Sequence, residues 1–145
     1  MKRFAFPLET ARTWRLRRLE VEEIRLRQLY LERDGIQQRI RGLRQELADE
    51  EKLLSGGALE ARELVALDDF RGHVRATEQR LNLEMRNCDQ RIAAQKKQLV
   101  EARRHFELLD RLREKALLEW RAGHAREQEQ LAAELYLARL AREIR

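Results

Sequence analysis

The side chains that most readily bind metals are few in this chain and lie far apart. The histidines are His73, His105 and His124, and the single cysteine is Cys88. A protein zinc site needs three or four closely placed nitrogen, sulfur or oxygen ligands. Glu101 and His105 are four residues apart, so a helix places them on one face, but two ligands do not make a metal site. We therefore expect no metal site.

Side chains suited to covalent catalysis or nucleotide hydrolysis are also sparse. Cys88 has no neighbouring histidine, and the only serine, Ser55, precedes the glycine pair Gly56-Gly57. No Lys-Ser or Lys-Thr follows that pair, so the chain lacks a phosphate-binding loop of the nucleotide hydrolases. Carboxylates are numerous, but acid–base catalysis needs a concave pocket, which a thin pair of helices does not offer. We expect no catalytic residues, no cofactor and no enzymatic activity.

The elements that carry these residues are predicted by an apolar repeat of seven on both sides of Gly56-Gly57. The repeat before the pair comprises Leu26, Leu29, Ile36, Ile40, Leu43, Leu47 and Leu54. The repeat after it comprises Leu64, Leu67, Val74, Leu81, Met85, Cys88, Ile92, Leu99, Ala102, Phe106 and Leu109. Alternating steps of three and four are the a/d pattern of a coiled coil, and a glycine pair lets the chain reverse.

Composition agrees with long helices. Of the 145 residues, 39% are charged and one is proline. We predict an all-α fold, a single coiled-coil domain over residues 1–145. It is an antiparallel two-helix coiled-coil hairpin with a longer second helix. Helix one covers about residues 7–54, the turn covers 55–57 and helix two covers about 58–142.

The glycine pair also predicts the register. We expect a glycine there to end helix one in the left-handed conformation. A turn centred near Gly57 places Leu26 opposite Cys88 and Leu47 opposite Leu67. Dimerisation through the same seam is the alternative, because heptads pair with any suitable partner.

Helix two has no partner within the chain beyond about Phe106. The overhang still carries large apolar residues, including Leu117, Trp120 and Leu131. An amphipathic helix without an internal partner indicates a partner elsewhere, with fraying or self-association as the alternative. The sequence does not decide whether the free overhang is ordered or the protein monomeric.

The formal net charge of +5 raises the question of nucleic-acid binding. Most basic residues are interleaved with acidic ones, as expected for a solvated helix surface. An N-terminal cluster is the exception; it contains Arg3, Arg12, Arg15, Arg17 and Arg18. A basic arm running into a zipper would suit DNA, but this segment carries Leu8 and Trp14 and lacks the residues that read bases. A generic coiled-coil adaptor is the leading alternative function, and a basic nucleic-acid-binding coiled coil is less favoured.

The expected location is cytoplasmic. No apolar run approaches the 18 residues of a membrane-spanning helix, and the N-terminal segment has no apolar core of a secretory signal. A single cysteine suits a reducing compartment.

Three segments together resemble the FliJ family of flagellar type III export proteins. Phe4-Ala5-Phe6-Pro7-Leu8-Glu9 resembles the family's F-x-F-x-L-E opening. Residues 106–115 (FELLDRLREK) resemble its L-E-x-L-K-E-(K/R) segment, and Trp120 with residues 125–131 (AREQEQL) resembles its closing R-x-E-Q-x-x-L region. Ala132-Ala133 stand where the family often has an Asp-Glu pair. The length, the central turn and the longer second helix also agree, so the likeness covers the whole chain.

The resemblance implies a stalk-like coiled coil of the flagellar export apparatus or of its injectisome counterpart. Such proteins bind the hexameric export ATPase, the membrane export gate and export chaperones, and they support flagellar assembly and motility. It implies a cytoplasmic protein peripherally associated with the inner membrane. From the residues themselves we expect neither a nucleic-acid partner nor a small-molecule substrate. Which chaperones bind is left open.

The same resemblance assigns candidate protein-binding residues. We expect the ATPase ring to contact the end of the hairpin that carries Arg12, Arg15, Arg18, Leu117, Trp120 and Leu131. The family's gate-binding surface lies near the turn, where the matching residues are Phe70, Val74 and Thr77. Phe70 is also a predicted seam residue.

Overall fold

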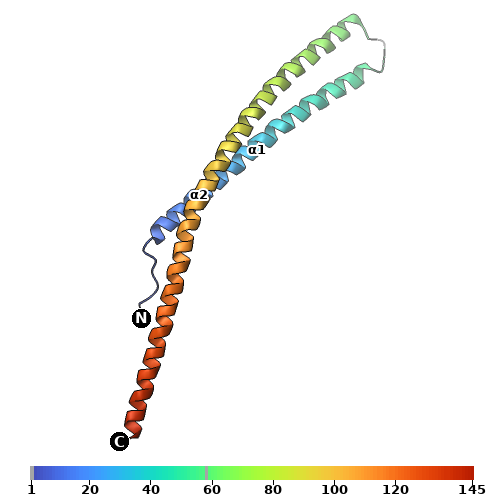
Figure 1. The fold of residues 1–145 in the computed structure, drawn as a ribbon. Coiled ribbons are helices and arrows are strands. Elements are labelled where there is room, and N and C mark those ends of the chain that lie inside the picture. Colours follow the sequence, from blue (N-terminus) through green and yellow to red (C-terminus); the bar gives the residue numbers. More distant parts are fainter. Residues whose placement is uncertain (1, 58) are drawn as a thin grey trace. The chain divides into compact units, whose positions relative to one another are not determined.

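Two helices that pack against each other make up the fold (Figure 1). The structure is a computed structural model that describes residues 2–57 and 59–145. Helix α1 covers Glu9–Leu54 and helix α2 covers Ala61–Glu143. The all-α hairpin with a longer second helix is therefore confirmed.

The chain divides into two compact units, each containing part of both helices. Unit 1 comprises Met1–Glu20 with Glu101–Arg145, and unit 2 comprises Val21–Val100. Unit 2 holds one connected apolar core, formed by Leu29, Ile36, Ile40, Leu81, Cys88 and Ile92. These residues belong to the predicted heptad repeats, so the a/d pattern located the core correctly.

The start of α1 follows a short irregular segment. Residues 2–6 form neither helix nor strand, and Pro7 and Leu8 form a turn. The backbone N–H of Glu9 donates to the Phe6 carbonyl at 3.1 Å, and that of Arg12 donates to the Leu8 carbonyl at 2.8 Å. Glu9 lies in the first turn, where its charge suits the positive end of the helix dipole. The helix begins two residues later than predicted, because Pro7 precedes the first turn instead of entering it.

The end of α1 differs from the prediction in its mechanism. No glycine among the described residues has positive φ, so the predicted left-handed glycine is wrong. Ser55 ends the helix instead. Its N–H donates to the Glu51 carbonyl at 3.0 Å, and its hydroxyl donates to the Lys52 carbonyl at 2.9 Å. These two bonds satisfy carbonyls of the last turn, so the helix needs no left-handed cap.

The start of α2 lies at Ala61 and not at the predicted Ala58, which is outside the described residues. Glu60 caps the helix: its carbonyl accepts from the N–H groups of Glu63 and Leu64 at 3.0 and 3.2 Å. The Glu63 carboxylate reaches back to the Glu60 N–H at 3.2 Å, which is half of a capping box.

The pairing of the two helices differs from the predicted register. The Cys88 thiol lies against Leu29, where its Sγ donates to the carbonyl oxygen at 3.4 Å. The sequence placed Leu26 opposite Cys88, so the observed pairing is displaced by three residues, or about one helical turn.

Candidate protein-binding surfaces

The residues predicted to contact the export gate differ in accessibility within unit 2. Val74 is 2% exposed, so its side chain belongs to the seam and offers no surface to a partner. Phe70 and Thr77 are half-buried. Thr77 lines a shallow groove of about 380 Å³ between the helices, together with Leu43 and Leu81. Of the three residues, only Phe70 and Thr77 expose atoms that a partner could contact.

A polar cluster interrupts the seam of unit 2. Glu22 is 2% exposed, although it carries a carboxylate. The Gln95 side-chain amide donates to this carboxylate and, at 3.1 Å, to the Glu22 backbone carbonyl. Arg25 forms an ion pair with the other carboxylate oxygen at 3.1 Å. The buried charge is therefore hydrogen-bonded from both helices, as a buried ion requires.

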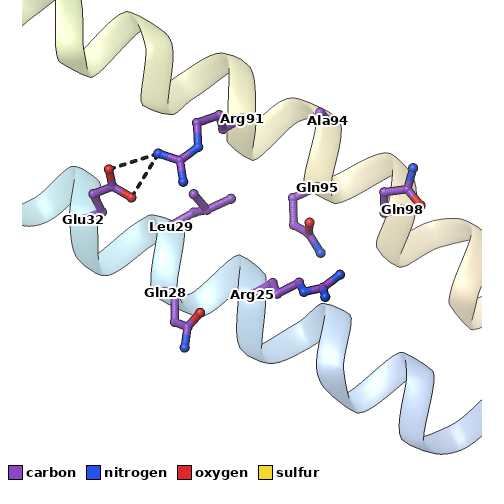
Figure 2. Close-up of a pocket in the computed structure, with 8 residues that line it drawn as sticks. All are labelled: Arg25, Gln28, Leu29, Glu32, Arg91, Ala94, Gln95 and Gln98. Carbon is purple, nitrogen blue, oxygen red and sulfur yellow. Dashed lines mark hydrogen bonds and ion pairs between the residues drawn. The ribbon is translucent and has the colours of Figure 1, made fainter.

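A cleft of about 420 Å³ lies beside this cluster (Figure 2). Arg25 and Gln95 extend into the space between the helices, whereas Gln28 points away from α2. Arg91 donates to both carboxylate oxygens of Glu32, at 3.1 and 3.3 Å. Each guanidinium at the cleft is thus paired with a carboxylate: Arg25 with Glu22 and Arg91 with Glu32. The Arg91–Glu32 pair ties the two helices together, and neither arginine is left unpaired for an anionic ligand.

Cys88 is the most buried side chain of the core, at 1% exposed. Burial raises the pKa of its thiol, and the negative charge of Glu32 raises it further. A buried, protonated thiol is a poor nucleophile.

Arg12, one of the three arginines predicted to bind the ATPase, is held within unit 1 by residues of both helices. Arg12 forms ion pairs with Asp110 at 2.7 Å and with Glu9 at 3.3 Å. The hydrogen bond from Arg12 to Asp110 raises the pKa of the guanidinium. Its guanidinium also lies 5.3 Å from the centroid of the Phe106 ring. Arg12 therefore joins the first turn of α1 to α2.

Arg15, in the same unit, is half-buried. Its guanidinium stacks 4.8 Å from the centroid of the exposed Trp14 ring and lies 3.2 Å from Nδ1 of His105. Arg18, one turn further along, is exposed. The structure therefore separates a structural arginine, Arg12, from two arginines that a partner could reach.

The N-terminal segment packs on α2, a contact that the sequence did not reveal. The ring of Phe4 meets Trp120 edge-on, with centroids 5.9 Å apart and planes at 62°. The indole Nε1–H of Trp120 donates to the Lys2 carbonyl at 3.3 Å, and its ring stacks on His124 at 5.3 Å. The Arg113 guanidinium lies 5.8 Å from the Phe4 centroid. The sequence feature that could have predicted this contact is the pair Phe4 and Phe6 before Pro7. A segment that packs on nothing would be expected to carry polar residues instead.

The last part of α2 exposes apolar side chains beyond these contacts. Leu117 is half-buried, but Leu131 is 52% exposed. Leu135, Tyr136 and Leu137 are each more than 60% exposed, as is Ile144 just after the end of the helix. The predicted overhang with exposed apolar side chains is therefore present in unit 1. It includes Leu118, which is 65% exposed, before Trp120.

Two searches of the described residues bear on other kinds of site. No group of three or more His, Cys, Asp or Glu side chains in residues 2–57 and 59–145 is placed to hold a metal ion. No helix in that part of the chain combines the length and the hydrophobicity that crossing a bilayer requires.

The fold and the surfaces together define a helical hairpin with an exposed apolar helix end. Comparison of the chain with protein-family models, curated proteins and solved structures finds no match.

Proposed function

We propose that this protein is a non-catalytic component of a bacterial type III export apparatus. In this proposal, a cytoplasmic, stalk-like hairpin binds the hexameric export ATPase, and it also contacts the membrane export gate and export chaperones. The proposal starts from the resemblance of Phe4–Glu9, residues 106–115 and residues 125–131 to the FliJ family. A flagellar system is proposed first, with the injectisome as its counterpart.

The exposed apolar end of α2 is the observation that carries the proposal. Leu131, Leu135 and Leu137 are 52%, 70% and 63% exposed in unit 1. Exposed apolar groups gathered on one helix end favour a protein partner, because their burial by that partner releases ordered water. Aromatic and arginine side chains, which carry much of the energy in protein interfaces, lie in the same unit as Trp120, Arg15 and Arg18.

The ATPase-binding role can be tested by pull-down with the purified export ATPase. The wild-type chain should co-purify with it. The variant L131A/L135A and the variant R15A/R18A should each bind about tenfold more weakly, the effect of losing interface side chains worth roughly 1–2 kcal/mol. Helicity measured by circular dichroism should not change, because none of these residues belongs to the buried core.

The matched control is L31A. Leu31 is 70% exposed, like Leu135, but it lies on α1 in unit 2. L31A should bind the ATPase as the wild type does. Absence of wild-type binding would reject the proposal in favour of a generic coiled-coil adaptor. Equal binding by all variants would reject the assignment of the contact to unit 1.

A further inference from the structure

The contact of Lys2 and Phe4 with Trp120 has a consequence for partner binding. We propose that residues 2–6 are a strap that masks a partner-binding surface centred on Trp120, so that a partner must displace the chain's own N-terminal segment. The inference deepens the proposed function and rests on it for the identity of the partner, which is the export ATPase.

The strap occupies the start of the exposed end of α2. Helix α1 begins at Glu9. Glu9 forms an ion pair with Arg113 of α2 at 3.2 Å. The irregular segment before Glu9 then continues along α2 as far as Trp120. The large side chains of α2 beyond this point, such as Leu131, are exposed. Within unit 1 the strap therefore covers the apolar end of α2 at Trp120, whereas Leu118 stays exposed.

The contacts of the strap are suited to exchange. They comprise one edge-on aromatic pair, one hydrogen bond from the indole to the Lys2 carbonyl, and the Arg113 guanidinium over the Phe4 ring. Residues 2–6 have no ladder of helix or strand hydrogen bonds to break. Both Phe4 and Trp120 remain half-buried. A partner that offers an aromatic ring and a backbone carbonyl to Trp120 can replace each of these contacts with one of the same kind.

Masking predicts a specific thermodynamic signature. The apparent affinity of a partner is reduced by the fraction of molecules in which its surface is covered. Loss of one aromatic pair shifts such an equilibrium by about two- to tenfold. Removing the Phe4 ring should therefore strengthen partner binding, whereas removing a residue of the surface itself should weaken it.

The first test reports on the strap alone. In a W14F background Trp120 is the single tryptophan, so its emission can be followed without interference. Adding F4A should move the emission to longer wavelength and raise its quenching by acrylamide. L118A, which removes an exposed side chain two residues from Trp120, is the control and should change neither. Unchanged emission in W14F/F4A would overturn the strap.

The second test measures affinity for the purified export ATPase. F4A should bind about two- to tenfold more tightly than the wild type, and W120A should bind more weakly. If the Phe4 contact only stabilised the fold, F4A would lower the thermal midpoint and would not strengthen binding. Equal or weaker binding by F4A would overturn the masking.

The two tests separate the possible failures. If W14F/F4A shows the emission shift but no variant binds the ATPase, the proposed function and the masking of its partner both fail, and the strap contact stands. If the ATPase binds the wild type but emission does not respond to F4A, the proposed function stands and the strap fails.

Discussion

Single residues in the seam of unit 2 contribute through close packing. Ile36 is 5% exposed within the core cluster, and truncating it leaves a cavity that the surrounding helices fill only in part. We predict that I36A lowers the free energy of unfolding by about 2–5 kcal/mol, measured by urea denaturation followed at 222 nm. The exposed Leu31 provides the control, because L31A should change the free energy of unfolding by less than about 0.5 kcal/mol. Equal effects of the two variants would contradict the seam as described.

The buried carboxylate of Glu22 is a residue-scale exception to that packing. Gln95 and Arg25 hydrogen-bond to it, so removal of Gln95 leaves a buried charge with fewer partners. We predict that Q95L destabilises the protein by about 1–3 kcal/mol in the same urea experiment. The double variant E22L/Q95L should be as stable as the wild type or more so, since two leucines complete the apolar seam. A double variant less stable than Q95L would contradict this account.

The thiol of Cys88 predicts a pH dependence. Its folded-state pKa is raised by burial, so the folded protein holds the thiol proton at pH values where the unfolded chain releases it. The stabilising contribution of Cys88 is therefore fully present below the unfolded pKa of about 8.5, and it falls as the pH rises above that value towards the raised folded pKa. We predict that the stability difference between wild type and C88A shrinks from pH 7 to pH 10. A difference that stays constant would contradict a buried thiol.

At the scale of elements, the heptads predicted the two helices and the core. The register predicted from the position of the glycine pair was wrong by about one helical turn. Leu29, Ile36 and Cys88 are buried as their spacing requires. The length of the connection was harder to predict from the sequence. The bond between Glu60 and Glu63 forms only when α2 starts at Ala61, and the sequence alone did not indicate that start. The contact of Phe4 with Trp120 was missed for a related reason, since no periodic pattern links residues so far apart in the chain.

The corrected register makes a prediction about the pairing of α1 with α2. Because the Cys88 thiol touches the backbone of Leu29, a cysteine at position 29 should form a disulfide with Cys88 under mild oxidation. A cysteine at position 26, the pairing expected from the glycine pair alone, should crosslink more slowly. Non-reducing electrophoresis of L29C and L26C measures both rates. Faster crosslinking of L26C would restore the register predicted from the sequence.

At the scale of the whole molecule, many of the charged side chains form ion pairs between the two helices. Cross-helix ion pairs recur in both units, including Arg33–Asp89, Arg71–Glu51 and Arg12–Asp110. Each exposed pair contributes little stability, of order 0–1 kcal/mol, but opposite charges matched between the helices disfavour other pairings. The net charge of +5 is therefore weak support for nucleic-acid binding, because many of the arginines already face acids.

Stability should also differ along α2. In unit 2 its residues face α1 and include Val74, Leu81 and Ile92, all buried. In unit 1 its residues beyond Trp120 include Leu135 and Leu137, which are exposed. Helices owe most of their stability to tertiary packing, so the uncovered end should open far more readily than the seam.

Hydrogen exchange measures this difference directly. We predict that amides of residues 70–95 exchange slowly in the free protein and that amides of residues 125–143 exchange at least 100-fold faster, because only the first set is covered by a second helix. Adding the export ATPase should slow exchange in 125–143 and leave 70–95 unchanged. Slow exchange at the end of α2 in the free protein, persisting on dilution, would mean that a stable partner helix already covers it. Rapid exchange that the ATPase does not alter would place the contact with the ATPase elsewhere, since burial of the exposed leucines must protect the amides that carry them.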